Sequence, residues 1–582
     1  MKGTLRFFVS TSLTAWAIAF VALNGPAARA ASLPGTATVS GVVDSSKPFH
    51  AAQVYFRNPE KRMLYMVYTV GGHYQASQLS PGNYEVSVAT KGLQNLASDV
   101  SKLTLKAGQN ATMNLSLHEV PSNKKPIEYL TFNEIYPQGQ GRAVLQRTCV
   151  YCHGENFLPS KHWTEQQWNG ALDYMTGKGN PSGAMIQPKE MNAQDRADAL
   201  AYLVANFGPN SKERAVAVQS DMPVDESKLA HAEYIEYYFP EDAPGKGVHD
   251  PKYAKGGAEG AMSEGRRSGK DPQLDADGNV WILDRGTPNR LVKLDPRTGE
   301  YKEWLTPEPT AGDDNLIIDR KAGLIWMAEN VGVPAGKMKL RAFNIKNEKW
   351  EQEYLLDPQD VIKTKKTAAS LTFDSKGNIY VVFIEGGAMG KWNRETKVVN
   401  TYPIPTPNSF PYGIVTDKFD NIWIAEFHGS KIAKFDPKTN TYTEYQPPTQ
   451  PALIRRLNLD SDGQTIWFGL FSAGKLDKLD PTTGKITEWK IPQQVSQPYD
   501  FVAEKGQIWF SDAGQGGALI KFDPKSESFT YFPSPQLADM PKISITKEGA
   551  IWYSPRSSRD HPGLGVLYPD ITKITTLAAY HP

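Results

Sequence analysis

Apolar and polar residues alternate in short runs over most of the chain. Between residues 33 and 118 these runs are "ATVSGVVD", "AAQVYFRN", "RMLYMVYT", "NYEVSVAT" and "ATMNLSL", separated by Gly, Pro, Asn and Ser. Alternation with a period of two, in runs rich in β-branched and aromatic residues, is typical of half-buried strands. The segment 33–118 is therefore predicted to be a small β-sandwich.

From residue 135 to 208 the apolar residues recur at three- and four-residue spacing instead. The pattern runs through "GRAVLQRTCVYCHG", "TEQQWNGALDYMTGKG" and "NAQDRADALAYLVANFG". Such spacing predicts amphipathic helices, the last of them capped by Asn192 and ended by Gly208. We expect a small all-α domain here.

The rest of the chain, residues 272–582, repeats itself. Each unit holds a line such as "DADGNVWILD" or "DKFDNIWIAE", and the central aromatic residues lie mostly about 43 residues apart, which is the period of β-propeller blades. These aromatics are Trp281, Trp326, Tyr380, Trp423, Trp467, Trp509 and Trp552. The sequence thus predicts a multidomain, mainly β protein: a sandwich, a small all-α domain and a seven-bladed propeller.

The segment 211–271 is predicted to be a polar linker that contains one strand-like run, "AEYIEYYFP". This run resembles the fourth strand of a blade, so it is a candidate for closing the ring by pairing with the last blade. The C-terminal run "KITTLAAYHP" competes for the same position.

Residues 1–30 have the pattern of an export signal. Lys2 and Arg6 precede an apolar run, and the small residues of "GPAARA" predict cleavage after Ala30. No later segment is long and apolar enough to predict a membrane span. We therefore expect a periplasmic or otherwise exported protein.

The charge balance argues against one class of partner. Lys and Arg together number 64 and Asp and Glu 63, so the formal net charge is +1. A nucleic-acid-binding protein usually has an excess of basic residues. The composition therefore predicts no nucleic-acid partner.

The two cysteines of the chain stand in "TCVYCHGEN", as Cys149 and Cys152 with His153 directly after them. On a helix the two thiols lie on one face, from which they can add to the two vinyl groups of one haem while the imidazole ligates the iron. Two alternatives remain. A zinc site needs a fourth ligand, for which His162 is the nearby candidate, and a redox dithiol needs a βαβ setting.

Residues 135–208, with this motif and a last helix containing "ALAYLVANFG", resemble a small class I cytochrome c. The resemblance implies one covalent haem c on Cys149 and Cys152, with His153 as an axial iron ligand and a methionine as the sixth ligand. Met185, in "GKGNPSGAMIQPKE", fits that position best. Met175 and Met191 are alternatives, and so is a histidine-ligated or open iron.

Two further resemblances concern the β domains. "GGHYQASQLSPGNYEVSV" resembles the carboxypeptidase regulatory-like, transthyretin-like sandwich, which implies a spacer or docking role. "PYGIVTDKFDNIWIAEFHGSKIAKFDP" resembles repeats of the virginiamycin B lyase family of seven-bladed propellers. That family uses magnesium and histidines in catalysis.

This chain departs from the lyase pattern at the catalytic positions. Tyr412, Tyr499 and Lys542 stand where the resemblance would place the histidines, and Asp512 and Pro555 where it would place late-blade carboxylates. Streptogramin cleavage is therefore not expected. Magnesium or another divalent metal at the propeller has no support in these residues.

Polar residues at repeat positions near one mouth of the channel remain candidates for a site. The ends of the inner strands are predicted to bring together Asp284, Glu329, Glu385, Glu426 and Asp512, with Tyr412, His428, Arg455, Arg456, Tyr499 and Lys542 as neighbours. Such a group can bind a metal or a polar substrate. The alternative is that the acids only hold hydrogen bonds between blades. The catalytic candidates are Glu426, His428, Asp512 and Tyr499.

The function predicted from these features is haem-based electron transfer in the periplasm. As an enzyme, the protein would be a cytochrome c-dependent dehydrogenase that oxidises a small-molecule substrate at the propeller and passes the electrons to a periplasmic electron-transfer protein. Two other functions remain open: a non-catalytic electron-transfer or docking protein, and a metal-dependent lyase with an accessory haem. The sequence does not decide among them.

Overall fold

The fold is that of a computed structural model of the chain. The residues that it describes are 33–90, 93–94, 100–119, 128–130, 132–150, 157–159, 161–178, 186, 188, 190–212, 214–216, 224–253, 267–286, 288–310, 312–331, 338–362, 367–471, 473–492, 496–513, 517–536, 540–555 and 561–577. The predicted export signal lies outside these residues. About 45% of the chain is strand and 11% is helix, so the prediction of a mainly β protein is confirmed.

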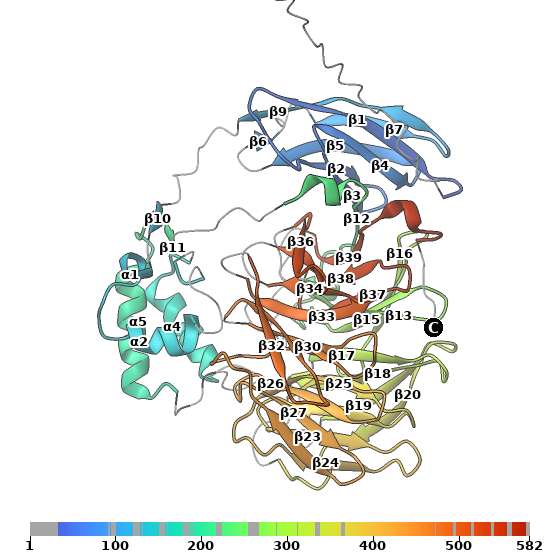
Figure 1. Ribbon diagram of the computed structural model, residues 1–582. Helices are drawn as coiled ribbons and strands as arrows, with labels where there is room; N and C mark the ends of the chain where they lie inside the picture. Colours follow the sequence, from blue (N-terminus) through green and yellow to red (C-terminus); the bar gives the residue numbers. More distant parts are fainter. Residues whose placement is uncertain are drawn as a thin grey trace, which may run out of the picture.

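The N-terminal strands form one core at the top of Figure 1. They pair along a path that runs from β3 through β2, β5, β6, β9 and β1 to β4, with β7 on β5 and β8 on β1. Alternate residues such as Val54, Phe56, Val86 and Val88 are buried between them, as the period of two predicts. The strands are β1 (Ala37–Ser45), β2 (Gln53–Asn58), β3 (Met63–Tyr68), β4 (His73–Leu79), β5 (Gly82–Thr90), β6 (Leu93–Gln94), β7 (Ser101–Leu105), β8 (Asn110–Thr112) and β9 (Leu115–Glu119).

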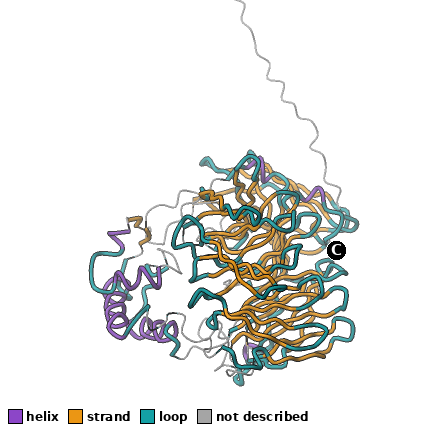
Figure 2. Tube along the Cα trace, turned by 60° about the horizontal axis from the view of Figure 1, so that its bottom comes forward, coloured by secondary structure: helices purple, strands orange, loops and turns teal. Residues whose placement is uncertain are grey.

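A helical region stands to the left of the two β domains in Figures 1 and 2. The helix that Asn192 was predicted to cap begins there: the Asn192 side chain accepts a hydrogen bond from Asp195 N–H, and Gly208 ends the helix, which confirms both predictions. The elements are α1 (Phe132–Ile135), α2 (Arg142–Leu145), the π-helical turn η2 (Gln146–Val150), α4 (Glu165–Met175) and α5 (Ala193–Phe207), with β10 (Glu128–Leu130) paired to β11 (Arg214–Val216).

Close packing of α2 against α5 holds this region together. Gly141, which precedes α2, has a φ of 87°, and a Cβ at this position would lie 2.9 Å from Tyr202 Cβ on α5. Trp168 on α4 donates its indole N–H to Phe207 O at 3.1 Å. The apolar faces predicted from the sequence spacing thus meet in one cluster around Leu145, Leu172 and Leu203.

Six separate four-stranded sheets make up the first six blades of the propeller. In each blade the strands follow one another from the channel outward. They are β13 (Gly269–Leu274), β14 (Val280–Asp284), β15 (Arg290–Asp295), β16 (Glu300–Leu305); β17 (Gly312–Asp319), β18 (Leu324–Val331), β19 (Lys339–Asn344), β20 (Lys349–Leu355); β21 (Ala368–Phe373), β22 (Ile379–Phe383), β23 (Ala388–Trp392), β24 (Val399–Pro403); β25 (Pro411–Thr416), β26 (Ile422–Glu426), β27 (Lys431–Asp436), β28 (Thr441–Tyr445); β29 (Leu457–Leu459), β30 (Ile466–Leu470), β31 (Lys475–Leu479), β32 (Ile486–Lys490); and β33 (Pro498–Glu504), β34 (Gln507–Asp512), β35 (Ala518–Asp523), β36 (Ser528–Pro533).

In blades 1, 3 and 4 the repeated aromatic residue is held by an aspartate six positions before it. Asp417 Oδ2 accepts the indole N–H of Trp423 at 2.8 Å, while Asp417 Oδ1 accepts the backbone N–H of Asn421. Asp275 holds Trp281 in the same way, and Asp374 accepts the hydroxyl of Tyr380. The repeat motif therefore encodes a turn between the first two strands and an anchor for the buried ring.

The seventh blade contains a strand from outside the repeat. It consists of β37 (Ile543–Ile545), β38 (Ile551–Tyr553), β39 (Gly563–Tyr568) and β12 (Glu233–Tyr238), which pairs antiparallel with β39. The run "AEYIEYYFP" thus completes the last blade. The described part of the competing C-terminal segment, residues 573–577, contains no strand, and its first residue is the last of a short helical turn, η5 (Ile571–Lys573).

The other edge of β12 pairs antiparallel with β3. The sheet of the N-terminal domain and the last blade are therefore one continuous sheet, in which all six residues of β12 are buried. Glu233 on β12 accepts the backbone N–H of Ser77 on β4 at 2.9 Å. The junction leaves no open strand edge on β12, and it docks the two β domains to each other.

Two short helical elements lie in the chain between the helical region and the propeller. They are α6 (Glu226–Leu229), just before β12, and the 3₁₀ turn η3 (Gly247–His249), just after it. Among the helices that the structure describes, none has the length and apolar character of a membrane span.

Candidate functional site

Cys149 is the described part of the Cys-x-x-Cys-His motif. It lies in η2, the π-helical turn that continues α2, and only 9% of its surface is exposed. It belongs to the same apolar cluster as Leu145, Leu158 and Trp168, and this burial raises the pKa of its thiol. An apolar surrounding of this kind suits a porphyrin, whose faces are apolar.

Cys152, His153 and Met185 lie outside the described residues, so the predicted attachment and iron ligation remain predictions. The two alternative methionines are described. Met175 is half-buried at the end of α4, and its carbonyl accepts the N–H of Ile186 at 2.9 Å. Met191 is 4% exposed and belongs to the apolar cluster.

The helical region also contains a buried cation with an unused donor. Arg142, two helical turns before Cys149, is 7% exposed. Its Nη2 donates to Asn133 Oδ1 at 2.5 Å, whereas Nη1 has no hydrogen-bond partner among the residues that the structure describes. A buried guanidinium with a free donor suits a carboxylate such as a haem propionate, so this residue also fits the predicted cofactor.

In the propeller, the innermost strands place one ring of polar side chains across the channel. Asn315 Nδ2 donates to Asp271 Oδ2 at 2.8 Å, Ser370 Oγ to Asn315 Oδ1 at 3.1 Å, and Arg456 Nη1 to Ser370 Oγ at 2.9 Å. Lys542 Nζ lies 3.8 Å from Asp271 Oδ1. Blades 1, 2, 3, 5 and 7 are thereby linked through their side chains.

Asp500 of blade 6 is the remaining charged member of this polar ring. It is 4% exposed and accepts the N–H of Ile543 at 2.9 Å. Burial raises the pKa of its carboxyl group, and the cations Lys542 and Arg456 oppose that shift. The two cations and two carboxylates of the polar ring therefore balance each other in charge.

A second layer, next to the polar ring, combines phenols with a guanidinium. The hydroxyls of Tyr412 and Tyr499 are 2.9 Å apart, and Arg455 Nη1 donates to the Tyr499 hydroxyl at 3.1 Å. The Arg455 guanidinium carbon lies 4.3 Å from the ring centroid of Phe471 and 4.8 Å from that of Phe427. Donors on a rigid aromatic wall of this kind suit an oxygen-bearing organic substrate.

At the level of the polar ring, blade 4 has Gly413. Because glycine has no side chain, the backbone of Arg455 and Arg456 in blade 5 can pack directly against it. A Cβ at Gly413 would lie 2.8 Å from Arg456 Cα and 3.0 Å from Arg455 O. We expect Gly413→Ala to lower the free energy of unfolding by about 1–3 kcal/mol, because the backbone of blade 5 must move. Denaturant unfolding followed by tryptophan fluorescence measures this.

The matched control is Gly170→Ala on α4, where a Cβ meets nothing within 4 Å. That variant should be as stable as the parent protein or slightly more stable, because alanine favours a helix. Equal stability of Gly413→Ala and the parent would contradict the close packing of blades 4 and 5.

Most of the acids predicted at the channel mouth are engaged in hydrogen bonds within or between blades. Asp284 accepts from Ser268 N and Arg267 Nε, and Glu329 from Lys339 N and Arg341 Nε. Asp512 Oδ1 accepts the N–H of Gln497, and Glu385 is half-buried. This is the structural role that the sequence left open as an alternative.

Glu426 is fully buried in blade 4, next to Thr406 and Glu444. Burial, followed by the nearby Glu444 carboxylate, raises its pKa to about 8. Asp477 in blade 5 is also fully buried, and burial, followed by the Glu488 carboxylate, raises its pKa to about 8. The sequence analysis did not single out Asp477.

His428 follows β26 and stacks on Phe410, with ring centroids 4.3 Å apart. It is half-buried, and its ring lies 5.2 Å from that of Phe427, which borders Arg455. Of the four catalytic candidates, Tyr499 belongs to the channel layer and His428 borders it. Glu426 and Asp512 are the last residues of the second strands of blades 4 and 6, β26 and β34, and do not belong to this layer.

The acids and histidines of the described part of the chain do not gather into a metal site. Within it, no group of three or more His, Cys, Asp or Glu residues is arranged to hold a metal ion. His162, the candidate fourth ligand of a zinc site, places its Nδ1 2.7 Å from Ser211 Oγ. The predicted haem iron ligands His153 and Met185 are not among the described residues.

Sequence reasoning missed four members of the polar ring, Asp271, Asn315, Ser370 and Asp500. All lie about ten residues before the repeated aromatic of their blade, at the place where the first strand borders the channel. A β-bulge shifts the register here in blades 1, 2, 3, 4 and 6. An alignment of the repeats at this position, rather than at the ends of the second strands, would have found them.

Comparison with known proteins supports the propeller assignment. Residues 344–560 match the Virginiamycin B lyase family, from the end of β19 to just beyond β38. This part of the chain is therefore a virginiamycin B lyase-like β-propeller, which confirms the prediction for the propeller region. A search of the curated proteins found no match.

Among solved structures, a streptogramin B lyase is similar at 22% identity, over 58% of this chain and 97% of that chain, with a TM-score of 0.47. A catalytically inactive virginiamycin B lyase from Staphylococcus aureus, solved with quinupristin, is similar at 20% identity over 52% of this chain and 94% of that one, with a TM-score of 0.45.

Proposed function

We propose that this protein is an exported c-type cytochrome that takes electrons from a small substrate bound at the propeller and passes them to another electron-transfer protein. The observation that carries the proposal is the Cys-x-x-Cys-His motif, with Cys149 buried in an apolar cluster at the end of a helix. Cys149 and Cys152 would hold the haem, and His153 and Met185 would ligate its iron. Such a haem supplies one-electron chemistry.

The second channel layer is the proposed substrate site. The hydroxyls of Tyr412 and Tyr499 and the Arg455 guanidinium offer donors to a substrate oxygen, while Phe427 and Phe471 cover apolar parts. The replacement of the lyase histidines by Tyr412 and Tyr499 favours a reaction other than streptogramin cleavage. We propose that these side chains bind and orient the substrate.

A screen of small organic compounds tests this function. The purified oxidised protein, mixed with each compound without any other carrier, should acquire the visible spectrum of a reduced c-type haem with at least one of them. Tyr499→Phe should slow that reduction by roughly tenfold, because it removes one hydroxyl from the site. Reduction by dithionite should stay unchanged.

Tyr402→Phe, on the fourth strand of blade 3, is the matched control and should react at the parent rate. Reduction by a partner protein but by no small compound would favour the non-catalytic alternative. An activity that chelators abolish without any change in haem reduction would favour a metal-dependent lyase. A protein without covalent haem, made with the haem-attachment machinery, would refute the proposal.

A further inference from the structure

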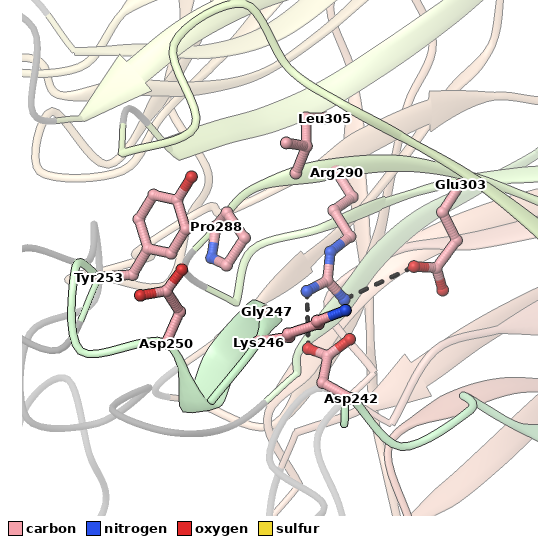
Figure 3. Close-up of a pocket in the computed structure, with 9 residues that line it drawn as sticks. All are labelled: Asp242, Lys246, Gly247, Asp250, Tyr253, Pro288, Arg290, Glu303 and Leu305. Carbon is pink, nitrogen blue, oxygen red and sulfur yellow. Dashed lines mark hydrogen bonds and ion pairs between the residues drawn. The ribbon is translucent and has the colours of Figure 1, made fainter. Parts of the chain in front are cut away.

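A separate pocket lies at the side of blade 1, between that blade and the segment that follows β12. Its volume is about 380 Å³, which is within the size range of small-ligand sites. Figure 3 shows Tyr253 and Asp250 on one side, Glu303 on the other, and Arg290 between them.

Arg290 presents a buried donor to this pocket. The residue is 4% exposed, and its Nη2 donates to Asp242 Oδ2 at 2.6 Å. Its Nη1 lies 3.5 Å from Glu303 and 3.7 Å from Asp284, and it makes no hydrogen bond with any described residue. The two carboxylates balance the charge of this group, while its N–H has no hydrogen-bond acceptor in the described part of the chain. An acceptor atom of a ligand would complete its hydrogen bonding.

Asp242, which orients Arg290, is itself fixed by the backbone. Its Oδ2 accepts the N–H of Val248 at 2.9 Å, and Gly247, with a φ of 55°, passes so close that a Cβ would overlap the Asp242 carboxylate. Burial and the Arg290 guanidinium act on this carboxyl group in opposite directions, and its pKa is lowered. The Asp242–Arg290 pair is therefore preformed.

The charges around the pocket alternate in sign. Asp242, Asp250 and Glu303 are acidic, while Lys246 and Arg290 are basic. An anionic ligand would meet carboxylates beside each cation, and a cationic ligand would meet cations beside each carboxylate. A neutral ligand with both donors and acceptors meets a suitable partner at every position.

The remaining wall is apolar. Pro288 and Leu305 stand between Tyr253 and Arg290 in Figure 3, and the Leu305 side chain is 50% exposed. A phenol ring beside such residues offers a flat apolar surface with a polar tip. The pocket thus combines a flat apolar wall with a rim of donors and acceptors.

We propose that this pocket is a binding site for a neutral polyhydroxy ring, that is, a monosaccharide or one glycosyl unit of a larger glycan. The C–H face of the ring would lie against Tyr253 and Leu305. The hydroxyls would accept from Arg290 Nη1 and Lys246 and donate to Asp250. This site is separate from the channel layer.

Titration calorimetry of the full-length exported protein with glucose, glucosamine and glucuronate tests the proposal. The three probes share one ring shape and differ in charge. Glucose should bind saturably, and the two charged sugars should bind no more tightly. Tyr253→Ala should weaken glucose binding by roughly tenfold, and Asp250→Ala by roughly three- to tenfold.

Phe419→Ala removes a 57% exposed aromatic side chain from blade 4, and it should leave glucose binding unchanged. Tighter binding of either charged sugar would overturn the assignment to neutral ligands. No saturable binding of glucose, or binding that Tyr253→Ala leaves intact, would overturn the site itself. Because the heat of binding needs no redox reaction, these outcomes are independent of the proposed electron transfer.

Discussion

Replacing Cys149 and Cys152 together with serine is expected to abolish covalent haem completely. The hydroxyl of serine does not form the thioether bonds that the Cys-x-x-Cys-His motif makes with the vinyl groups. The measurement is haem staining of the denatured protein in a gel, combined with the reduced visible spectrum of the native protein. The parent protein should stain strongly and the double variant not at all.

Two controls show whether a loss of stain comes from the motif itself and not from misfolding. Each single variant should retain part of the stain, since one thioether bond still attaches the ring. The β-sheet signal in far-ultraviolet circular dichroism should be the same in all variants, because about 45% of the chain is strand and the motif lies in the helical region. Full staining of the double variant would contradict haem attachment at these cysteines.

Replacing Glu426 with glutamine is expected to stabilise the propeller at alkaline pH. The pKa of Glu426 is about 8 in the folded protein, against 4.5 for an unburied glutamate. Below pH 4.5 both states bind the proton, so the group costs nothing. As the pH rises from 4.5 to 8 the unfolded state loses its proton first, and the free energy of unfolding falls.

A tenfold difference in proton affinity between the folded and unfolded states corresponds to ~1.4 kcal/mol, so the cost above pH 8 is on the order of several kcal/mol. Denaturant unfolding at pH 5, 7 and 9 should show a steep loss of stability in the parent protein and a smaller loss in Glu426→Gln. Asp477→Asn should act in the same way, because its carboxyl is buried with the same raised pKa. Glu300→Gln, at an exposed position of β16, is the control.

A parent protein whose stability does not change between pH 5 and 9 would show that Glu426 ionises freely, against the burial that the fold gives it. A Glu426→Gln variant with the parent's pH slope would assign the slope to other groups. Either result would also show that the Glu426 carboxyl is ionised at neutral pH, so that Glu426 could not serve as a catalytic proton donor there.

The sequence predicted local structure where the repeat made it visible. Asp417, Asn421 and Trp423 form the turn and ring anchor of one blade. The aromatic residue of this motif recurs at the blade period, so the blades could be counted. Asn192 and Gly208 lie at the two ends of α5 as predicted. These features depend on contacts between residues only a few positions apart, so a short stretch of sequence is enough to predict them.

Arg456 and Lys542 were predicted near the channel, but the polar ring to which they belong was not. Asp271, Asn315, Ser370, Arg456 and Lys542 come from five blades, and their side chains meet only because the ring closes around the channel. In the sequence, the acids at the ends of the second strands recur just after the repeated aromatic residue, so they were the ones predicted to line the channel. Asp284 and Glu329 instead form ion pairs with Arg267 and Arg341, respectively. Both acids are therefore engaged near their own blades and do not join the polar ring.

The Cys-x-x-Cys-His motif and the virginiamycin B lyase-like repeat can be read from the sequence, since each is a short, contiguous pattern. The fold was needed to show that β12 joins the last blade to β3 of the N-terminal domain, and that Arg290 is held by Asp242 beside a pocket at blade 1. Both arrangements depend on hydrogen bonds between residues far apart in the chain. A one-dimensional pattern does not specify which strand edge or which carboxylate will be the partner.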